Sequence, residues 1–166
     1  MTRYTPASGT FELRKAICDK LERDNDLYYK PQDIVVSSGA KHSLYNIFQA
    51  IIDPGDEVLI PTPCWVSYPE MVRMAGGVPV FIPTDESTNF IPHKKDIASR
   101  VTRRTKAMII TSPSNPNGSI WPREKLQFVA DLAVSHPFYV VSDEIYEKLI
   151  YDGEKHFSIA NIGETI

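Results

Sequence analysis

The sequence predicts an α/β protein, a three-layer α/β/α sandwich built around a mainly parallel sheet. Helical and strand-like patterns alternate along the 166 residues. The strand-like segments are continuous apolar runs without polar alternation, as expected when helices cover both faces of a parallel sheet. The length suits one domain of ordinary size with a substantial core.

Five apolar runs are predicted strands. One of them contains Pro79, which suits an edge strand or the first residues of a strand, so we expect it toward an edge of the sheet. In chain order the runs are 34–37, 57–60, 78–82, 107–110 and 138–142.

Helices are predicted between these runs. A helix follows Gly9-Thr10, with Thr10 as its N-cap, and an apolar stripe over 44–52 ends at 53–56. Pro69 is compatible with a helix over 67–75 because it falls in the first turn. A shorter helix is expected over 94–101. Pro122 opens the last helix, whose buried face is expected to be Leu126, Val129, Ala130 and Ala133.

The bulk composition excludes several classes of protein. A net charge of −3 without a basic stripe gives no nucleic-acid footprint. No apolar stretch is long enough for a membrane span. The two cysteines form no metal or redox spacing and fit reduced thiols in a cytoplasmic protein, and the four scattered histidines predict no metal site.

The most informative residue is Asp143, which ends the apolar run 138–142 and precedes Tyr146 by three positions. In open α/β sheets, ligands bind at the carboxyl ends of the strands. A carboxylate there can hold a protonated ring nitrogen of a cofactor, and the tyrosine can reach an oxygen of the same ring. Taken alone, Asp143 is more often a helix N-cap or a satisfied polar residue.

Three other loops carry comparable candidates, each directly after a predicted strand. Gly39-Ala40-Lys41 opens a helix and offers an anion site for a phosphate, or is an ordinary turn. Trp65 can lay its indole on a flat ring, or pack on the core. Asn115, in a rigid Asn-Pro-Asn-Gly loop, can aim its amide at a ring oxygen, or belong to a plain turn. All these loops are expected on one side of the sheet.

Together, these motifs resemble the class I/II aminotransferases, the pyridoxal-phosphate enzymes of the aspartate aminotransferase superfamily with the type I fold. The resemblance covers the whole chain, and 65–71 is similar to the bacterial aspartate (and prephenate) branch. The motifs occur in the expected order: Tyr4-Thr5-Pro6-x-x-Gly9, Gly39-Ala40-Lys41, Pro63-x-Trp65-x-x-Tyr68, Ser114-Asn115-Pro116-Asn117-Gly118 and Ser142-Asp143-Glu144-Ile145-Tyr146.

The resemblance implies a role for each cofactor-binding residue. Asp143 would pair with the pyridine nitrogen of pyridoxal 5'-phosphate, and Tyr146 and Asn115 would hydrogen-bond its phenolic oxygen. Trp65 would stack on the ring. The phosphate would be lined by Gly39, Ala40 and Lys41, and reached by Tyr4 of a neighbouring subunit, which implies a homodimer.

The resemblance also implies that the catalytic set is incomplete. The family's Schiff-base lysine lies beyond Ile166, as does the arginine that binds the substrate carboxylate, and we expect no catalytic residue in this chain. Lys148 and Lys155 do not occur in the required context. Asn117 replaces the family's usual threonine. We expect a fragment of the large domain, with an N-terminal segment and helix over 1–30 and a partial cofactor-binding domain over 31–166, and we read 163–166 as the approach to another strand.

The leading interpretation is a transaminase that acts on an amino acid, aspartate by resemblance, and a 2-oxo acid. The chain alone is expected to be inactive. Two alternatives stay open: a carbon–sulfur lyase on the same fold, and a non-catalytic cofactor-binding or interaction module.

Overall fold

The computed structural model describes residues 4–162. The strand approach expected at 163–166 lies outside them. Residue contacts divide the chain into two compact units, 1–46 and 47–166, which are described separately. The division into 1–30 and 31–166 made from the sequence stays a prediction. No helix within the described residues is long and apolar enough to cross a bilayer.

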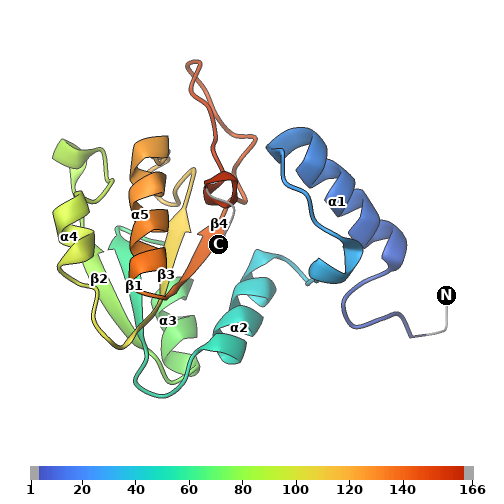
Figure 1. Ribbon diagram of the computed structural model, residues 1–166, viewed down its shortest axis with the longest axis horizontal. Coiled ribbons are helices and arrows are strands. Elements are labelled where there is room, and N and C mark those ends of the chain that lie inside the picture. Colours follow the sequence, from blue (N-terminus) through green and yellow to red (C-terminus); the bar gives the residue numbers. More distant parts are fainter. Residues whose placement is uncertain (1–3, 163–166) are drawn as a thin grey trace. The chain divides into compact units, whose positions relative to one another are not determined.

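The second unit is built around a parallel sheet, which has four strands in the described residues (Figure 1). β1 (Glu57–Thr62) lies between β2 (Val78–Pro83) and β3 (Thr105–Thr111), and β4 (Tyr139–Asp143) lies on the far side of β3. Each neighbouring pair is parallel. The carboxyl ends of all four strands therefore lie at the same edge of the sheet.

Helices cover both faces of this sheet. α3 (Ser67–Met74) connects β1 to β2, whereas α4 (Lys94–Ala98) and α5 (Arg123–Ser135) lie in the connections from β2 to β3 and from β3 to β4. The first crossover runs across the sheet in one direction and the other two run in the opposite direction. Because such crossovers are right-handed, α3 packs on one face and α4 and α5 on the other. The predicted three-layer architecture is confirmed.

Strand side chains alternate between the two helical layers. Leu59 of β1 and Met108 of β3 are fully buried and belong to the same core cluster as Leu126 of α5. The neighbouring positions Ile60 and Ile109 are buried on the opposite face of the sheet, where α3 contacts β1 and β2. The central strands are thus buried on both faces, which explains their continuous apolar runs.

Local signals predicted several elements correctly. β2, with its internal Pro79, is an outer strand of the described sheet. Pro122 is the N-cap of α5. The buried residues of α5 are those expected from the sequence: Leu126, Val129, Ala130 and Ala133.

The helix predicted over 94–101 is shorter, since α4 covers Lys94–Ala98. The N–H of Arg100 donates to the carbonyl of Ile97 at 3.0 Å and the N–H of Val101 to that of Ala98 at 3.3 Å. These bonds reach back three residues rather than four, so the chain tightens into turns before β3.

The first unit contains α1 (Phe11–Asn25), a 3₁₀ turn at Pro31–Asp33 and the start of α2 (Ala40–Ile51). The predicted cap is confirmed, because Thr10 Oγ1 accepts a hydrogen bond from the Leu13 N–H at 3.4 Å. Gly9 precedes the cap with φ +95°, and a Cβ there would lie 2.8 Å from the side chain of Val36. Both its backbone conformation and this close approach require glycine.

The strand predicted at 34–37 is wrong, because these residues form no strand in the described part of the chain. An extended segment becomes a strand only when a neighbour pairs with its backbone groups. The Val36 N–H instead donates to the carbonyl of Ser8 at 3.0 Å, a cross-link to the N-terminal segment rather than a rung of a sheet ladder. Val35 is 66% exposed, so its apolar side chain does not have the cover that the pattern indicated.

Candidate cofactor site

The carboxyl edge of the sheet gathers the candidate residues of the second unit. Asp143 is the last residue of β4, and Trp65 and Asn115 lie in the loops that follow β1 and β3. The connections leave β1 and β3 toward opposite faces of the sheet, and this reversal opens a crevice between the two strand ends. The expectation that these loops share one side of the sheet is confirmed for this unit.

A hydrogen-bonded group of three side chains lies at this edge. The hydroxyl of Tyr68 donates to Asp143 Oδ2 at 2.7 Å and lies 2.8 Å from Thr111 Oγ1. The N–H of Ile145 donates to Asp143 Oδ1 at 3.3 Å. Burial chiefly, and the nearby carboxylate of Asp143, raise the pKa of Tyr68, although its hydrogen bond with Thr111 opposes the shift. Tyr68 therefore keeps its proton and acts as a donor at neutral pH.

The indole of Trp65 packs against this group. Its ring meets the ring of Tyr68 edge to face, with centroids 5.4 Å apart and planes at 88°. Tyr68 is 2% exposed, whereas Trp65 is partly exposed. The indole is thus fixed by a buried neighbour and still presents surface to a ligand.

Asn115 lines a small recess between the ends of β1 and β3, together with Cys64, Thr111 and Ser114. Burial raises the pKa of the Cys64 thiol. No hydrogen bond between Asn115 and Asp143 or Tyr146 is present in the described part of the chain. The structure therefore places Asn115 at the correct edge without joining it to the acid.

Tyr146 follows Asp143 in a turn whose Leu149 N–H donates to the Tyr146 carbonyl at 2.8 Å. The neighbouring Glu144 carboxylate anchors the same segment. Its Oε1 accepts hydrogen bonds from the hydroxyls of Ser142 at 2.7 Å and Ser158 at 2.8 Å, and its Oε2 lies 2.9 Å from His156 Nε2. These contacts hold the chain that carries Tyr146 against β4.

The Glu144 network also bears on the histidines, which the sequence showed as scattered. Potential ligand atoms of Glu144, Glu147 and His156 lie within 4.8 Å of one another. The Nε2 of His156 is already engaged with Glu144. We interpret the cluster as a hydrogen-bond network that fixes the loop.

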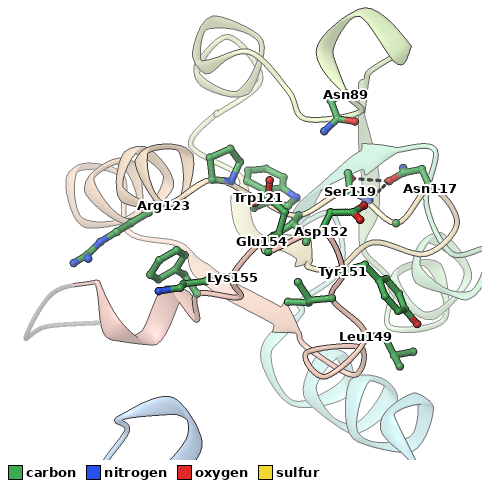
Figure 2. A pocket seen from close by; sticks show the side chains of 16 residues that line it. Asn89, Asn117, Ser119, Trp121, Arg123, Leu149, Tyr151, Asp152, Glu154 and Lys155 are labelled. Carbon is green, nitrogen blue, oxygen red and sulfur yellow. Dashed lines mark hydrogen bonds between the residues drawn. The ribbon is translucent and has the colours of Figure 1, made fainter.

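A larger hollow lies elsewhere (Figure 2). It encloses about 740 Å³ between the loop 117–123 and the segment 149–157. Its lining mixes the cations Arg123 and Lys155 with the anions Asp152 and Glu154 and includes neither Asp143 nor Trp65. Asp143 and Trp65 do not line the smaller recess either, but its Thr111 is linked to Asp143 through the hydroxyl of Tyr68. We place the cofactor chemistry at this carboxyl edge of the sheet, because the acid, the indole and the amide all lie at the strand ends there.

The first unit holds the remaining candidates. Gly39 has φ +89° and its carbonyl accepts from the His42 N–H at 3.1 Å, so it turns the chain into α2. Ala40 is the first residue of that helix and Lys41 the second. The leading N–H groups of a helix lack partners within it and bind anions readily. Tyr4 is fully exposed.

The donor set fits pyridoxal phosphate. Each carboxylate oxygen can accept about two hydrogen bonds, so Asp143 keeps acceptor capacity beyond the bonds from Tyr68 and Ile145. The indole and the amide complete the contacts that a flat, hydroxylated pyridinium ring needs. Taken by itself, the glycine turn at the start of α2 in the first unit suits a phosphate.

Sequence reasoning included Tyr68 in a family motif but gave it no role at the site, and it missed Thr111. The spacing Trp-x-x-Tyr was a usable signal, because it places Tyr68 in the first turn of α3, just past the indole. Thr111 carried no signal of its own. Its role depends on the parallel register in which Thr111 pairs with Asp143.

Residues 1–166 match the family described as aminotransferase class I and II. The chain belongs to this family, as the motifs indicated.

Bacterial aspartate and aspartate/prephenate aminotransferases are among the relatives of this chain. The aspartate aminotransferase of Bacillus sp. (strain YM-2) is 51% identical over 165 residues, which are 99% of this chain and 42% of the relative. The aspartate/prephenate aminotransferase of Thermus thermophilus is 51% identical over 157 residues, 95% of this chain and 40% of the relative. The chain thus spans about two fifths of the length of these relatives.

Solved structures agree with this. The aspartate aminotransferase from Thermus thermophilus with maleate matches with a TM-score of 0.94 at 49% identity, over 97% of this chain and 42% of that one. An aromatic aminotransferase from Pyrococcus horikoshii matches with a TM-score of 0.95 at 41% identity, over 98% and 44%. The predicted α/β fold is confirmed by both.

Proposed function

We propose that this chain supplies the cofactor-holding part of an aminotransferase that uses pyridoxal phosphate to move the amino group of aspartate to a 2-oxo acid. The observation that carries the proposal is the placement of Asp143 beside Tyr68 and Trp65 at the carboxyl edge of a parallel sheet. The relatives named aspartate aminotransferase support the choice of amino acid.

In the proposed site, each side chain holds one part of the cofactor. The Asp143 carboxylate accepts a hydrogen bond from the protonated ring nitrogen, and Trp65 covers the ring face. Asn115 and Tyr146 donate to the phenolic oxygen, and Gly39, Ala40 and Lys41 bind the phosphate. When bound, pyridoxal phosphate supplies an electron-withdrawing ring that stabilises negative charge on the substrate's α-carbon.

The proposal extends to the assembly and its compartment. We propose a homodimer in which Tyr4 reaches the phosphate of the neighbouring subunit, and its exposed side chain supports this. We also propose a cytoplasmic enzyme, which the free thiols of Cys18 and Cys64 support.

Cofactor binding tests the proposal directly. Replacing the acid with its neutral isostere (Asp143→Asn) should weaken pyridoxal phosphate binding roughly 10- to 100-fold, because a hydrogen bond to a charged group is lost. Quenching of tryptophan fluorescence during titration measures the affinity. The matched control is Asp131→Asn, an exposed residue of α5, which should bind like the parent chain. Equal affinities for all three proteins would contradict the proposal.

Covalent capture tests the expected lack of a catalytic lysine. After incubation with pyridoxal phosphate and reduction with borohydride, mass spectrometry should find scattered or absent labelling of lysines. The reason is that the attachment lysine is expected outside residues 1–166. Stoichiometric labelling of one lysine, such as Lys148 or Lys155, would show that this chain carries its own attachment site.

A further inference from the structure

We propose that Tyr68 is a positioning residue. Its hydroxyl accepts a hydrogen bond from Thr111 and fixes the Asp143 carboxylate in the orientation that meets the cofactor's ring nitrogen. The expected effect on cofactor binding rests on the proposed function, whereas the orientation of the Asp143 carboxylate can be measured without any cofactor.

The direction of the hydrogen bonds follows from proton counting. A phenol hydroxyl carries one proton. Tyr68 donates that proton to Asp143 Oδ2, at 2.7 Å. The 2.8 Å contact between Tyr68 and Thr111 must therefore be donated by the threonine hydroxyl. The three groups form a one-way chain of donors, from Thr111 through Tyr68 to Asp143.

This chain of donors is anchored at both ends by regular structure. Thr111 and Asp143 are the last residues of adjacent strands and pair in register. Tyr68 lies in the first turn of α3, is 2% exposed, and packs edge to face against Trp65. A donor held this firmly can fix the plane of the carboxylate.

Asp143 needs such a donor because its own geometry is weakly determined. The terminal torsion of an aspartate side chain has a broad energy profile, so the backbone alone does not fix the carboxylate plane. The other hydrogen bond to the side chain comes from the Ile145 N–H at 3.3 Å, on the opposite oxygen. Without the Tyr68 hydroxyl, the Asp143 side chain should rotate among several conformers.

A purely structural role would predict different effects of removing the Tyr68 hydroxyl. If the hydroxyl only needed a hydrogen-bond partner in the interior, Thr111 would be sufficient, and its removal would lower the stability of the chain and weaken the binding of every ligand equally. A positioning role acts through Asp143 and hence through the ring nitrogen alone. A cofactor analogue with carbon in place of that nitrogen distinguishes the two roles.

The first experiment compares Tyr68→Phe with Tyr139→Phe, a matched change at an exposed residue of β4. Each chain is titrated with pyridoxal phosphate and with its 1-deaza analogue. Tyr68→Phe should bind pyridoxal phosphate roughly tenfold more weakly, the value of a hydrogen bond to a charged group, and the analogue unchanged. Tyr139→Phe should match the parent for both. Equal weakening of both compounds, or of neither, overturns the proposal.

The second experiment needs no cofactor. In crystals or by carboxyl-carbon NMR, the Asp143 side chain should occupy one conformer in the parent chain and several in Tyr68→Phe. A single unchanged conformer overturns the proposal. If the parent chain binds neither compound, the proposed function fails for this chain while this readout still decides the positioning role.

A milder variant covers the case in which Tyr68→Phe does not fold. Thr111→Val keeps the buried phenol and the shape of its neighbour but removes the outer donor. It should weaken pyridoxal phosphate binding roughly two- to fivefold without affecting the analogue, since a neutral hydrogen bond contributes less than one to a charged group. If Thr111→Val binds pyridoxal phosphate as tightly as the parent chain does, the proposed chain of donors is wrong.

Discussion

A single buried charge shows how individual residues secure the amino end of the sheet. Glu57, the first residue of β1, is 5% exposed. Its Oε2 accepts a hydrogen bond from the Thr102 hydroxyl at 2.6 Å, and its Oε1 accepts from Arg104 Nη2 at 2.7 Å. A buried carboxylate is tolerated only with such partners, because an unpaired charge in the interior is costly.

This pairing leads to an asymmetric prediction for two adjacent arginines. Arg104→Ala should lower the free energy of unfolding by about 1–2 kcal/mol, since it leaves the buried Glu57 with one partner fewer. Arg103→Ala, at an exposed neighbouring position, should change it by less than about 0.5 kcal/mol. Urea unfolding of both variants measures the difference. Equal effects of the two substitutions on the free energy of unfolding would show that the ion pair between Arg104 and Glu57 does not stabilise the fold.

At the residue scale, the sequence was informative where a side chain's role follows from its position on one element. Asp143 could be placed because an apolar strand ends directly at it. Tyr68 and Thr111 could not be recognised as its partners, because their contacts join positions 75 and 43 residues apart. Such contacts depend on sheet order and register, which no local pattern specifies.

At the scale of elements, the segment after β4 depends on a hydrogen-bond network. Glu144 is the shared acceptor for the hydroxyls of Ser142 and Ser158, and it contacts His156. Together these bonds close the loop that contains Tyr146 onto the strand before it. The order of this loop is therefore expected to depend on one carboxylate.

Glu144→Gln should loosen this loop selectively. An amide replaces one acceptor oxygen with a donor, so a bond to that atom is lost or, at His156, has to reverse, which costs about 1–3 kcal/mol when it is lost. Hydrogen–deuterium exchange should increase over 145–158 and stay unchanged in β1 and β3. Glu154→Gln, an exposed change in the same segment, is the control. Uniformly faster exchange across the sheet would contradict a local role.

Helices and strands differed in how well the sequence predicted them. The start of α1 at Thr10, the N-cap of α5 at Pro122 and the buried face of α5 all follow from signals within a few residues. The strand expected at 34–37 failed because a strand also needs a partner. Its apolar side chains indicated a buried extended segment but could not supply the neighbouring backbone.

At the scale of the whole molecule, the outer edge of β4 is a place where the described sheet can pair with another chain. Within the described residues, β4 pairs with β3 on one side and with no strand on the other. Tyr139, its first residue, is 57% exposed. An unpaired edge with apolar side chains is a template for pairing with another chain.

The chain should therefore self-associate as its concentration rises, as measured by size-exclusion chromatography with light scattering. A charge on the edge strand (Tyr139→Lys) should shift the equilibrium toward the monomer, because charged edge residues oppose strand addition. Val134→Lys, at an exposed position of α5, carries the same charge away from the edge and should leave the association unchanged. A monomer at all concentrations would contradict the prediction.

The hydrogen bond between Tyr68 and Asp143 has a kinetic consequence. Its two ends are 75 residues apart, and three strands must already be aligned before the atoms can meet. Pairings between such distant positions form late, since the entropy of closing the intervening loop must first be overcome. During synthesis, Asp143 would emerge from the ribosome after β1, β2 and β3, so the ability to bind a ring should appear only after these strands have formed.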